Sequence, residues 1–420
     1  MSPTRTRGRG AVLALPVLLV LSLALLISAC GGEEESADPT TGKASGSITV
    51  WAPGVEGEKL PVLAKDFQKE NPGVKVKVTP IAIEQAHDKI LTSIAGGKTP
   101  DVAWVGSTWM GEFAKTGALD EAPSSIDQEQ FFQGARDAVT VDDKVFGVPW
   151  HVETRVLYYR TDIAKKAGIT KAPETWDELK AMATAMKEKG GAKYGIGLST
   201  NNWQEWAPFV WQNGGELASG DQYTLNSPEA TEATAFYKSF FDEELAPPQT
   251  PQGFDITPAF VRGTHPMFFS GPWHMGLIDE AGGKGFEKKW TVAKMPTKEA
   301  GTSFVGGGEL VVFKQSKNRE TAWKFAEYLT KPEVQAKFYK EAADLPSNQA
   351  AWDLPELASD PKLKLFGEQL EDAKTAPVFP KWEQFATKLN AQLDEAFTSD
   401  QSPEEATAKF QETAEATGSQ

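Results

Sequence analysis

The sequence predicts an α/β protein of two domains. Candidate strands and helices alternate from residue 48 onward, which favours largely parallel sheets with helices on both faces. Removal of an N-terminal export signal, residues 1–29, leaves 391 residues. A chain of this length is usually too long to fold around a single hydrophobic core. The chain has no internal repeat of solenoid length. Two α/β lobes are therefore expected.

The first 29 residues are predicted to be a lipoprotein signal peptide. Three arginines precede an uncharged apolar run over residues 11–27, as in an export signal. That run of 17 residues is short of the ~20 needed to span a bilayer, so a retained anchoring helix is the second hypothesis. The segment ISACG at 27–31 resembles the bacterial lipobox, which implies that Cys30 is lipidated and becomes the first mature residue. Cys30 is the single cysteine, which excludes a disulfide within the chain.

Residues 30–46 are predicted to be a flexible tether between the lipid and the folded protein. They are rich in Gly, Ser, Thr and Glu and have no apolar periodicity. The whole chain has a formal charge of −15, and removal of the three arginines of the signal makes it −18. Such a negative surface disfavours binding to nucleic acid or to anionic lipid headgroups.

The first five predicted elements run strand, helix, strand, helix, strand. Residues 48–51 form a short apolar strand, and 58–70 place three apolar side chains on one helical face. Alternating valines predict a strand over 74–78, and an apolar stripe predicts a helix over 83–94. The strand at 101–105 completes the unit.

Later helices are predicted from their start signals. The segments 175–178 and 330–333 have the spacing of capping boxes. Ser227 followed by Pro228 predicts a third helix start, because proline fits the first turn.

Catalytic and metal-binding signatures are absent from the sequence. There is no G-x-S-x-G and no H-E-x-x-H, and carboxylate pairs are expected by chance among 58 acidic residues. We therefore expect no enzyme activity and no cofactor. No metal site is expected either, because no two histidines are spaced i, i+4 and none has a thiol partner; the four are His87, His151, His265 and His274.

Tryptophan usage points to a ligand. The chain has 13 tryptophans, several beside Gly, Pro, Asn or Ser. An indole covers the C–H face of a pyranose and donates one hydrogen bond. The alternative for each is ordinary core packing. The candidates are Trp109, Trp150, Trp203, Trp206, Trp273 and Trp382.

Several short segments occur in a characteristic order along the chain. They are ITVW at 48–51, NPGV at 71–74, TPDVAW at 99–104, GVPW at 147–150, ETRVLYYRTD at 153–162, FSGPW at 269–273, GGG at 306–308 and LPS at 345–347. Together they resemble the family-one extracellular solute-binding proteins, the carbohydrate-binding group related to maltose-binding protein. The resemblance covers essentially the whole mature chain.

This resemblance implies a periplasmic-binding-protein-like fold, with two lobes joined by hinge strands and a sugar held between them. The hinge acid Glu153 would accept hydrogen bonds from sugar hydroxyls, and Trp273 would be the stacking platform of the second lobe. An ion pair between Glu153 and Arg155 or Arg160 is the alternative. The predicted ligand contacts are Glu56, Ser107, Thr108, Trp109, Trp150, Glu153, Thr154, Trp203, Trp206, Trp273, Gly307, Gly308 and Trp382.

The sequence departs from the maltose-binding prototype at two places. That prototype has acid–base pairs where this chain has Val55-Glu56 and Thr108-Trp109. Maltose specificity therefore does not follow from the resemblance.

The function expected from the resemblance is capture of a sugar or oligosaccharide for an ABC importer. The implied partners are permease subunits and, through them, a cytoplasmic ATPase, and the protein would be a monomer anchored by lipid to the outer face of a Gram-positive type membrane. The alternatives are a binding protein for another solute such as a polyol, and a lipid-anchored glycosidase. The predicted organisation is signal peptide 1–29, tether 30–46, first lobe 47–152 and 292–329, and second lobe 153–291 and 330–420.

Overall fold

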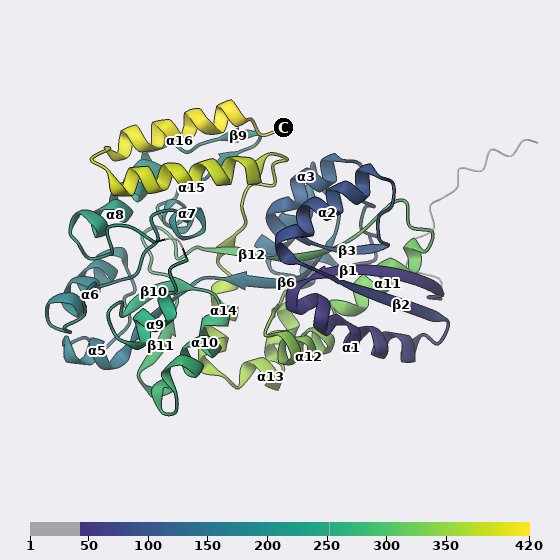
Figure 1. Cartoon of the computed structure of the whole chain (residues 1–420), viewed down its shortest axis with the longest axis horizontal. Helices are drawn as coiled ribbons and strands as arrows, with labels where there is room; N and C mark the ends of the chain where they lie inside the picture. The colour runs from purple at the N-terminus through teal and green to yellow at the C-terminus, as the bar shows by residue number, and fades with distance from the viewer. Residues whose placement is uncertain (1–42, 252) are drawn as a thin grey trace, which may run out of the picture. The chain divides into compact units, whose positions relative to one another are not determined.

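A computed structural model describes residues 43–251 and 253–420 of the chain (Figure 1). The predicted signal peptide, Cys30 and most of the predicted tether lie outside these residues. Within the described part, no helix is both long enough and apolar enough to cross a bilayer.

The larger of two main sheets has seven strands in the order β13-β6-β12-β3-β1-β2, with β14 pairing with β12. β1 pairs in parallel with β2 and with β3, whereas β12 is antiparallel to both β3 and β6. We call the sheet and the helices packed on it the first lobe. The strands are β1 (Gly46–Pro53), β2 (Val74–Ile81), β3 (Val102–Gly106), β6 (Val148–Thr154), β12 (Ser303–Val312), β13 (Leu345–Pro346) and β14 (Ala373–Lys374).

Alternate residues of the central strands fill two cores on opposite faces of this sheet. On β3, Val102 and Trp104 join one cluster while Ala103 and Val105 join the other, as the period of two in a strand requires. One face carries α1, α11 and α12, and the other carries α2 and α3 (Figure 1). The helices here are α1 (Gly54–Glu70), α2 (Ile83–Ala95), α3 (Met110–Lys115), α4 (Gln133–Val139), α11 (Arg319–Leu329) and α12 (Pro332–Ala342), with the hairpin β4 (Thr140–Val141) and β5 (Lys144–Val145).

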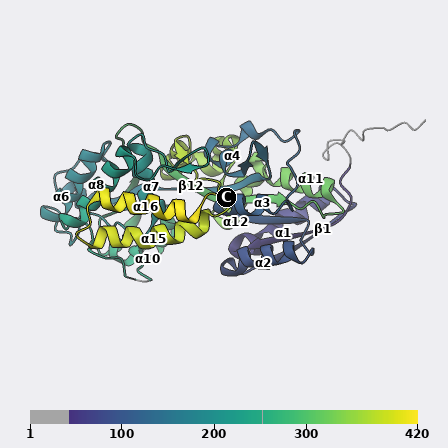
Figure 2. The ribbon, with the colours of Figure 1, turned by 90° about the horizontal axis from the view of Figure 1, so that it is seen from above.

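A smaller sheet, with the antiparallel order β10-β7-β11, forms the centre of the second lobe. The C-terminal helices α15 and α16 lie side by side (Figures 1 and 2) and contribute Leu389 and Phe410 to the core that also holds Trp206. The elements are β7 (Val156–Arg160), β8 (Ala218–Ser219), β9 (Gln222–Tyr223), β10 (Met267–Ser270), β11 (Trp290–Ala293), α5 (Thr161–Lys166), α6 (Trp176–Glu188), α7 (Trp203–Gln212), α8 (Pro228–Asp242), α9 (Ile256–Val261), α10 (Trp273–Gly282), α13 (Pro355–Ala358), α14 (Pro361–Leu370), α15 (Trp382–Thr398) and α16 (Pro403–Thr417).

Two chain segments connect the lobes through paired strands. β6 of the large sheet continues into β7 of the small sheet, and β12 runs beside β6 with Val305 opposite Thr154 (Figure 1). The Thr154 hydroxyl donates to the Phe304 carbonyl at 2.8 Å, and the Ser303 hydroxyl donates to the Arg155 carbonyl at 2.8 Å. These contacts fix the crossing segments against each other.

The expected α/β class with two lobes is confirmed, but the strand directions differ from the prediction. Among the strand pairs of the described residues, β1–β2, β1–β3 and β12–β14 are parallel and the others are antiparallel. Strands that cross between lobes return in the opposite direction, so their pairs are antiparallel. The predicted lobe boundaries stay predictions; α12, which begins after the predicted boundary at residue 330, packs on α1 of the first lobe.

Two of the three predicted helix starts have side-chain caps, although at 175–178 the reciprocal bond of a capping box is not formed, because Glu178 accepts from the Glu174 amide. Thr175 accepts a hydrogen bond from the Glu178 amide, and Ser227 accepts one from the Ala230 amide. Thr330 does not cap α12, because its hydroxyl donates to the Glu327 carbonyl instead and the helix begins one residue later.

Candidate functional site

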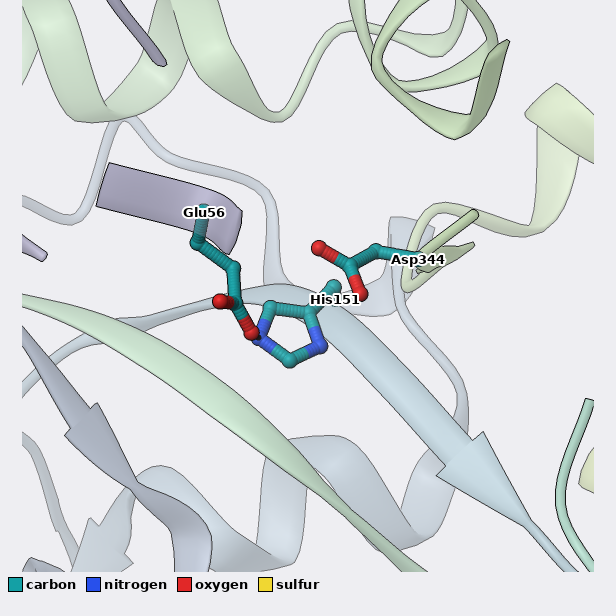
Figure 3. A group of neighbouring side chains, drawn as sticks. All are labelled: Glu56, His151 and Asp344. Carbon is teal, nitrogen blue, oxygen red and sulfur yellow. Dashed lines mark ion pairs between the residues drawn. The ribbon is translucent and has the colours of Figure 1, made fainter. Parts of the chain in front are cut away.

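Glu56, His151 and Asp344 come together from three distant parts of the chain (Figure 3). Glu56 lies in the first turn of α1, His151 on β6, and Asp344 directly before β13. One nitrogen or oxygen atom of each lies within 4.8 Å of the others. Glu153 lies two residues beyond His151 on β6, so both side chains leave the same face of the strand. We call Glu56, Glu153 and Asp344, grouped around His151, the carboxylate cluster.

His151 is neutral because of its surroundings. The indole N–H of Trp104 donates to His151 Nε2 at 2.8 Å, so Nε2 is an acceptor and we assign the ring proton to Nδ1. Burial lowers the pKa of His151, against the charges of Glu56 and Glu153, which raise it. Glu56 Oε1 lies 3.7 Å from Nε2, too far for a hydrogen bond, and with a neutral ring this approach is not an ion pair.

Two carboxylates of the cluster, Glu56 and Asp344, form no ion pair with a lysine or arginine among the residues that the structure describes. Burial and the charge of Glu153 raise the pKa of Asp344 to about 7. Burial also raises the pKa of Glu56, as do the charges of Asp344 and Glu153, while His151 opposes the rise. Asp344 Oδ2 is buried and has no hydrogen-bond partner among the residues that the structure describes. The cluster therefore brings three carboxylates together, and in the described part of the chain only Glu153 among them has a cationic partner, Arg155.

Glu153, Arg155 and Trp273 meet where β6 passes into β7. Arg155 Nη2 donates to Glu153 Oε1 at 3.3 Å and to Gln204 Oε1 at 3.0 Å. The guanidinium carbon lies 4.8 Å from the centre of a Trp273 ring, a cation–π distance. Trp273, the first residue of α10, is 40% exposed. A partly exposed acid and an exposed indole thus lie on either side of the buried guanidinium that contacts both, and the Glu153–Arg155 pair left open by the sequence is present.

The turn after β3 is hydrogen-bonded to a buried acid, Glu309. Ser107, Thr108 and Trp109 form a single 3-10 turn, and the Ser107 hydroxyl donates to Glu309 Oε1 at 2.7 Å. Glu309 on β12 is 2% exposed, and within residues 43–251 and 253–420 its Oε2 has no hydrogen-bond partner. Burial raises the pKa of Glu309 to about 8, against the Ser107 hydrogen bond, which lowers it. Glu309 is therefore protonated near neutral pH.

A family model described as bacterial extracellular solute-binding protein matches residues 51–336. This chain belongs to that family. A putative binding protein of Brucella abortus is 30% identical over 335 residues, which cover 77% of this chain and 80% of that protein. The galactooligosaccharide-binding protein of Bacillus subtilis is 24% identical, with 94% and 95% covered.

The solved structures agree in fold. The sugar-binding protein MalE of the phytopathogen Xanthomonas citri superposes with a TM-score of 0.84 and 30% identity, covering 89% of this chain and 97% of that one. The family is extracellular, so this solute-binding protein is exported.

Burial argues against ligand contact for four of the six candidate tryptophans of this solute-binding protein. Trp150, Trp203, Trp206 and Trp382 lie in the hydrophobic cores, and Trp206 is 0% exposed. Trp150 stacks on Phe338 with ring centres 4.7 Å apart. Neighbouring Gly, Pro and Asn mark the starts of elements, but the first turn of a helix can face the core, as it does at Trp203 and Trp382.

The glycines of β12 are required by packing. A Cβ on Gly308 would clash with the Trp104 indole, and one on Gly307 would clash with the His151 carbonyl. Gly307 also has a φ of 141°, which other residues rarely adopt. These two glycines allow β12 to approach β6 and so position the Trp104–His151 hydrogen bond.

Sequence reasoning missed His151, Asp344 and Glu309 as site residues. The alternation of β6 could have indicated His151, because it faces away from the buried Trp150 next to it. No local pattern marks Asp344 or Glu309, since both depend on packing between distant segments.

A cavity of about 460 Å³ in the second lobe lies beside the N-terminus of α10. Its lining includes Ser270, whose hydroxyl lies 2.6 Å from His274 Nδ1, and Glu205, whose carboxylate accepts from the Ser199 amide. Burial lowers the pKa of His274 to about 4, so its ring is neutral. The second lobe thus offers polar and aromatic groups next to Trp273.

Proposed function

We propose that this protein captures a sugar or oligosaccharide outside the cytoplasm and delivers it to an ABC permease. The observation that carries the proposal is family membership together with the Glu153–Arg155–Trp273 surface at the crossing strands. A carboxylate and a guanidinium bind hydroxyl groups, while the exposed indole covers an apolar sugar face. The relatives named above, which bind galactooligosaccharides or sugars, support this class of ligand.

The proposed mechanism is ligand-dependent closure of the lobes. A ligand that touches Trp273 of the second lobe and Glu56 of the first stabilises the form that makes both sets of contacts. The permease would recognise that closed form, and a cytoplasmic ATPase would drive transport. Lipidation at Cys30 would hold the protein near the permease at the outer face of the membrane, of Gram-positive type.

The proposal is tested by a thermal-shift screen of the purified protein against mono- and oligosaccharides and polyols. A ligand at 100 times its dissociation constant stabilises the protein by about 2.7 kcal/mol. Calorimetry with the best ligand should give one site per chain. A panel in which only polyols shift the unfolding temperature would replace the sugar by that alternative.

A second measurement tests the absence of chemistry. The bound ligand, recovered after long incubation and analysed by chromatography, should be unchanged. Cleavage that increases with protein concentration would instead establish the glycosidase.

A further inference from the structure

The carboxylate cluster contains three acidic groups, whereas a neutral sugar can be bound by uncharged hydrogen-bonding groups. Glu56, Glu153 and Asp344 interact with one another electrostatically. In the part of the chain that the structure describes, no lysine or arginine forms an ion pair with Glu56 or Asp344. The cation that contacts the cluster, Arg155, is shared between Glu153 and Gln204 and stacks on Trp273.

Leaving this charge unneutralised costs free energy. Carboxylates a few ångströms apart repel strongly where protein excludes water. The raised pKa values of Asp344 and Glu56 reflect that cost, because each group keeps its proton up to a higher pH than it would in water. The buried Asp344 Oδ2 adds an acceptor with no donor. A ligand that brings a positive charge and several N–H donors would remove both penalties.

A metal ion is a poorer match than an organic cation. The lone pair of His151 Nε2 accepts the Trp104 N–H, so this nitrogen would have to break a buried hydrogen bond before it could bind a metal. The remaining His151 nitrogen, Nδ1, carries the proton. An ammonium group needs only acceptors, and the three carboxylates provide them. Aromatic side chains are close by: Trp109 packs against Trp104, the donor to His151, and Trp273 lies against Arg155, the partner of Glu153.

We propose that the ligand is an amino sugar or an oligosaccharide that contains one, whose protonated amine binds among Glu56, Glu153 and Asp344. The inference rests on the proposed function, since it concerns the same binding region. It narrows the ligand from sugars in general to cationic ones.

The experiment compares two disaccharides that differ in charge. The β-1,4-linked disaccharide of glucosamine has free amines, and its N,N′-diacetyl form is neutral. Calorimetry at about pH 7 should give at least 10-fold tighter binding for the amine, and this preference should shrink as salt is raised from low to high concentration. The amine should also release protons from the protein, measured as a heat that depends on the ionisation enthalpy of the buffer, because the ammonium favours the ionised carboxylates.

Substitutions test whether the preference for the amine depends on the carboxylate cluster. Glu56→Gln should weaken binding of the amine by about 10-fold more than it weakens binding of the neutral disaccharide, because only the amine loses an ionic contact. Glu188→Gln, an exposed acid at the end of α6, is the matched control and should change neither. Asp344→Asn is the second test if Glu56→Gln unfolds early.

Each outcome separates this inference from the proposed function. Equal or tighter binding of the neutral disaccharide would overturn the cationic ligand and leave sugar capture in place. Binding of manganese or zinc that is lost in Glu56→Gln would make the cluster a metal site and also overturn the inference. If no sugar of either kind binds, the proposed function itself fails.

Discussion

Replacing Glu309 by glutamine should change how the stability of the protein depends on pH. Glu309 is buried on β12, and burial raises its pKa from 4.5 to about 8. Between these two values the folded protein holds a proton that the unfolded chain has released. Stability therefore falls as pH rises through this window, by about 1.4 kcal/mol per pH unit from this residue.

The expected size follows from the two pKa values. From pH 5.5 to pH 7.5 the wild-type protein should lose about 2–3 kcal/mol through Glu309, and the whole window corresponds to roughly 5 kcal/mol. Glu309→Gln does not titrate, and its carbonyl can still accept the Ser107 hydroxyl. The variant should thus come closest to wild type below about pH 4.5, and its stability relative to wild type should increase by about 2–3 kcal/mol between pH 5.5 and pH 7.5.

Urea unfolding of both proteins at pH 5.5, 6.5 and 7.5, followed by fluorescence, measures the difference. Other titrating groups contribute equally to both proteins and cancel. Ser107→Ala is the matched control: because the Ser107 hydrogen bond lowers the pKa of Glu309, its removal should extend the loss of stability to higher pH. A difference between Glu309→Gln and wild type that changes by less than about 0.5 kcal/mol over this range would mean that Glu309 is ionised in the fold, and would refute the reasoning.

Two further predictions concern the aromatic platform and the anchor. Trp273→Ala should weaken sugar binding by about 2–4 kcal/mol with little change in urea unfolding, whereas Trp206→Ala should destabilise the fold by about 3–5 kcal/mol. Normal binding with early unfolding in Trp273→Ala would make Trp273 a core residue. Cys30→Ser should leave uncleaved precursor or release the protein into the medium, as cell fractionation will report. A variant that stays on the membrane as fully as wild type would refute lipidation of Cys30 as the anchor, and retention without cleavage would make residues 11–27 the anchor.

The sequence alone determined the local elements and the family resemblance. Strands expected at 48–51, 74–78 and 101–105 are β1, β2 and β3, because alternation along a strand is a local property. Helix α1 starts at Gly54, four residues before the expected start, so Glu56 lies in its first turn. The motif order along the chain predicted the family that the comparison confirmed.

Only the tertiary structure decided which of these residues share a site. Trp206 and Trp273 were both candidates on the basis of their local sequence, but Trp206 is buried and Trp273 is exposed. Burial depends on what packs against each helix. Asp344 reaches His151 only because β13 pairs with β6, a contact across almost 200 residues that leaves no local pattern. Local periodicity fixes which face of an element is apolar, whereas the meeting of polar faces depends on long-range packing.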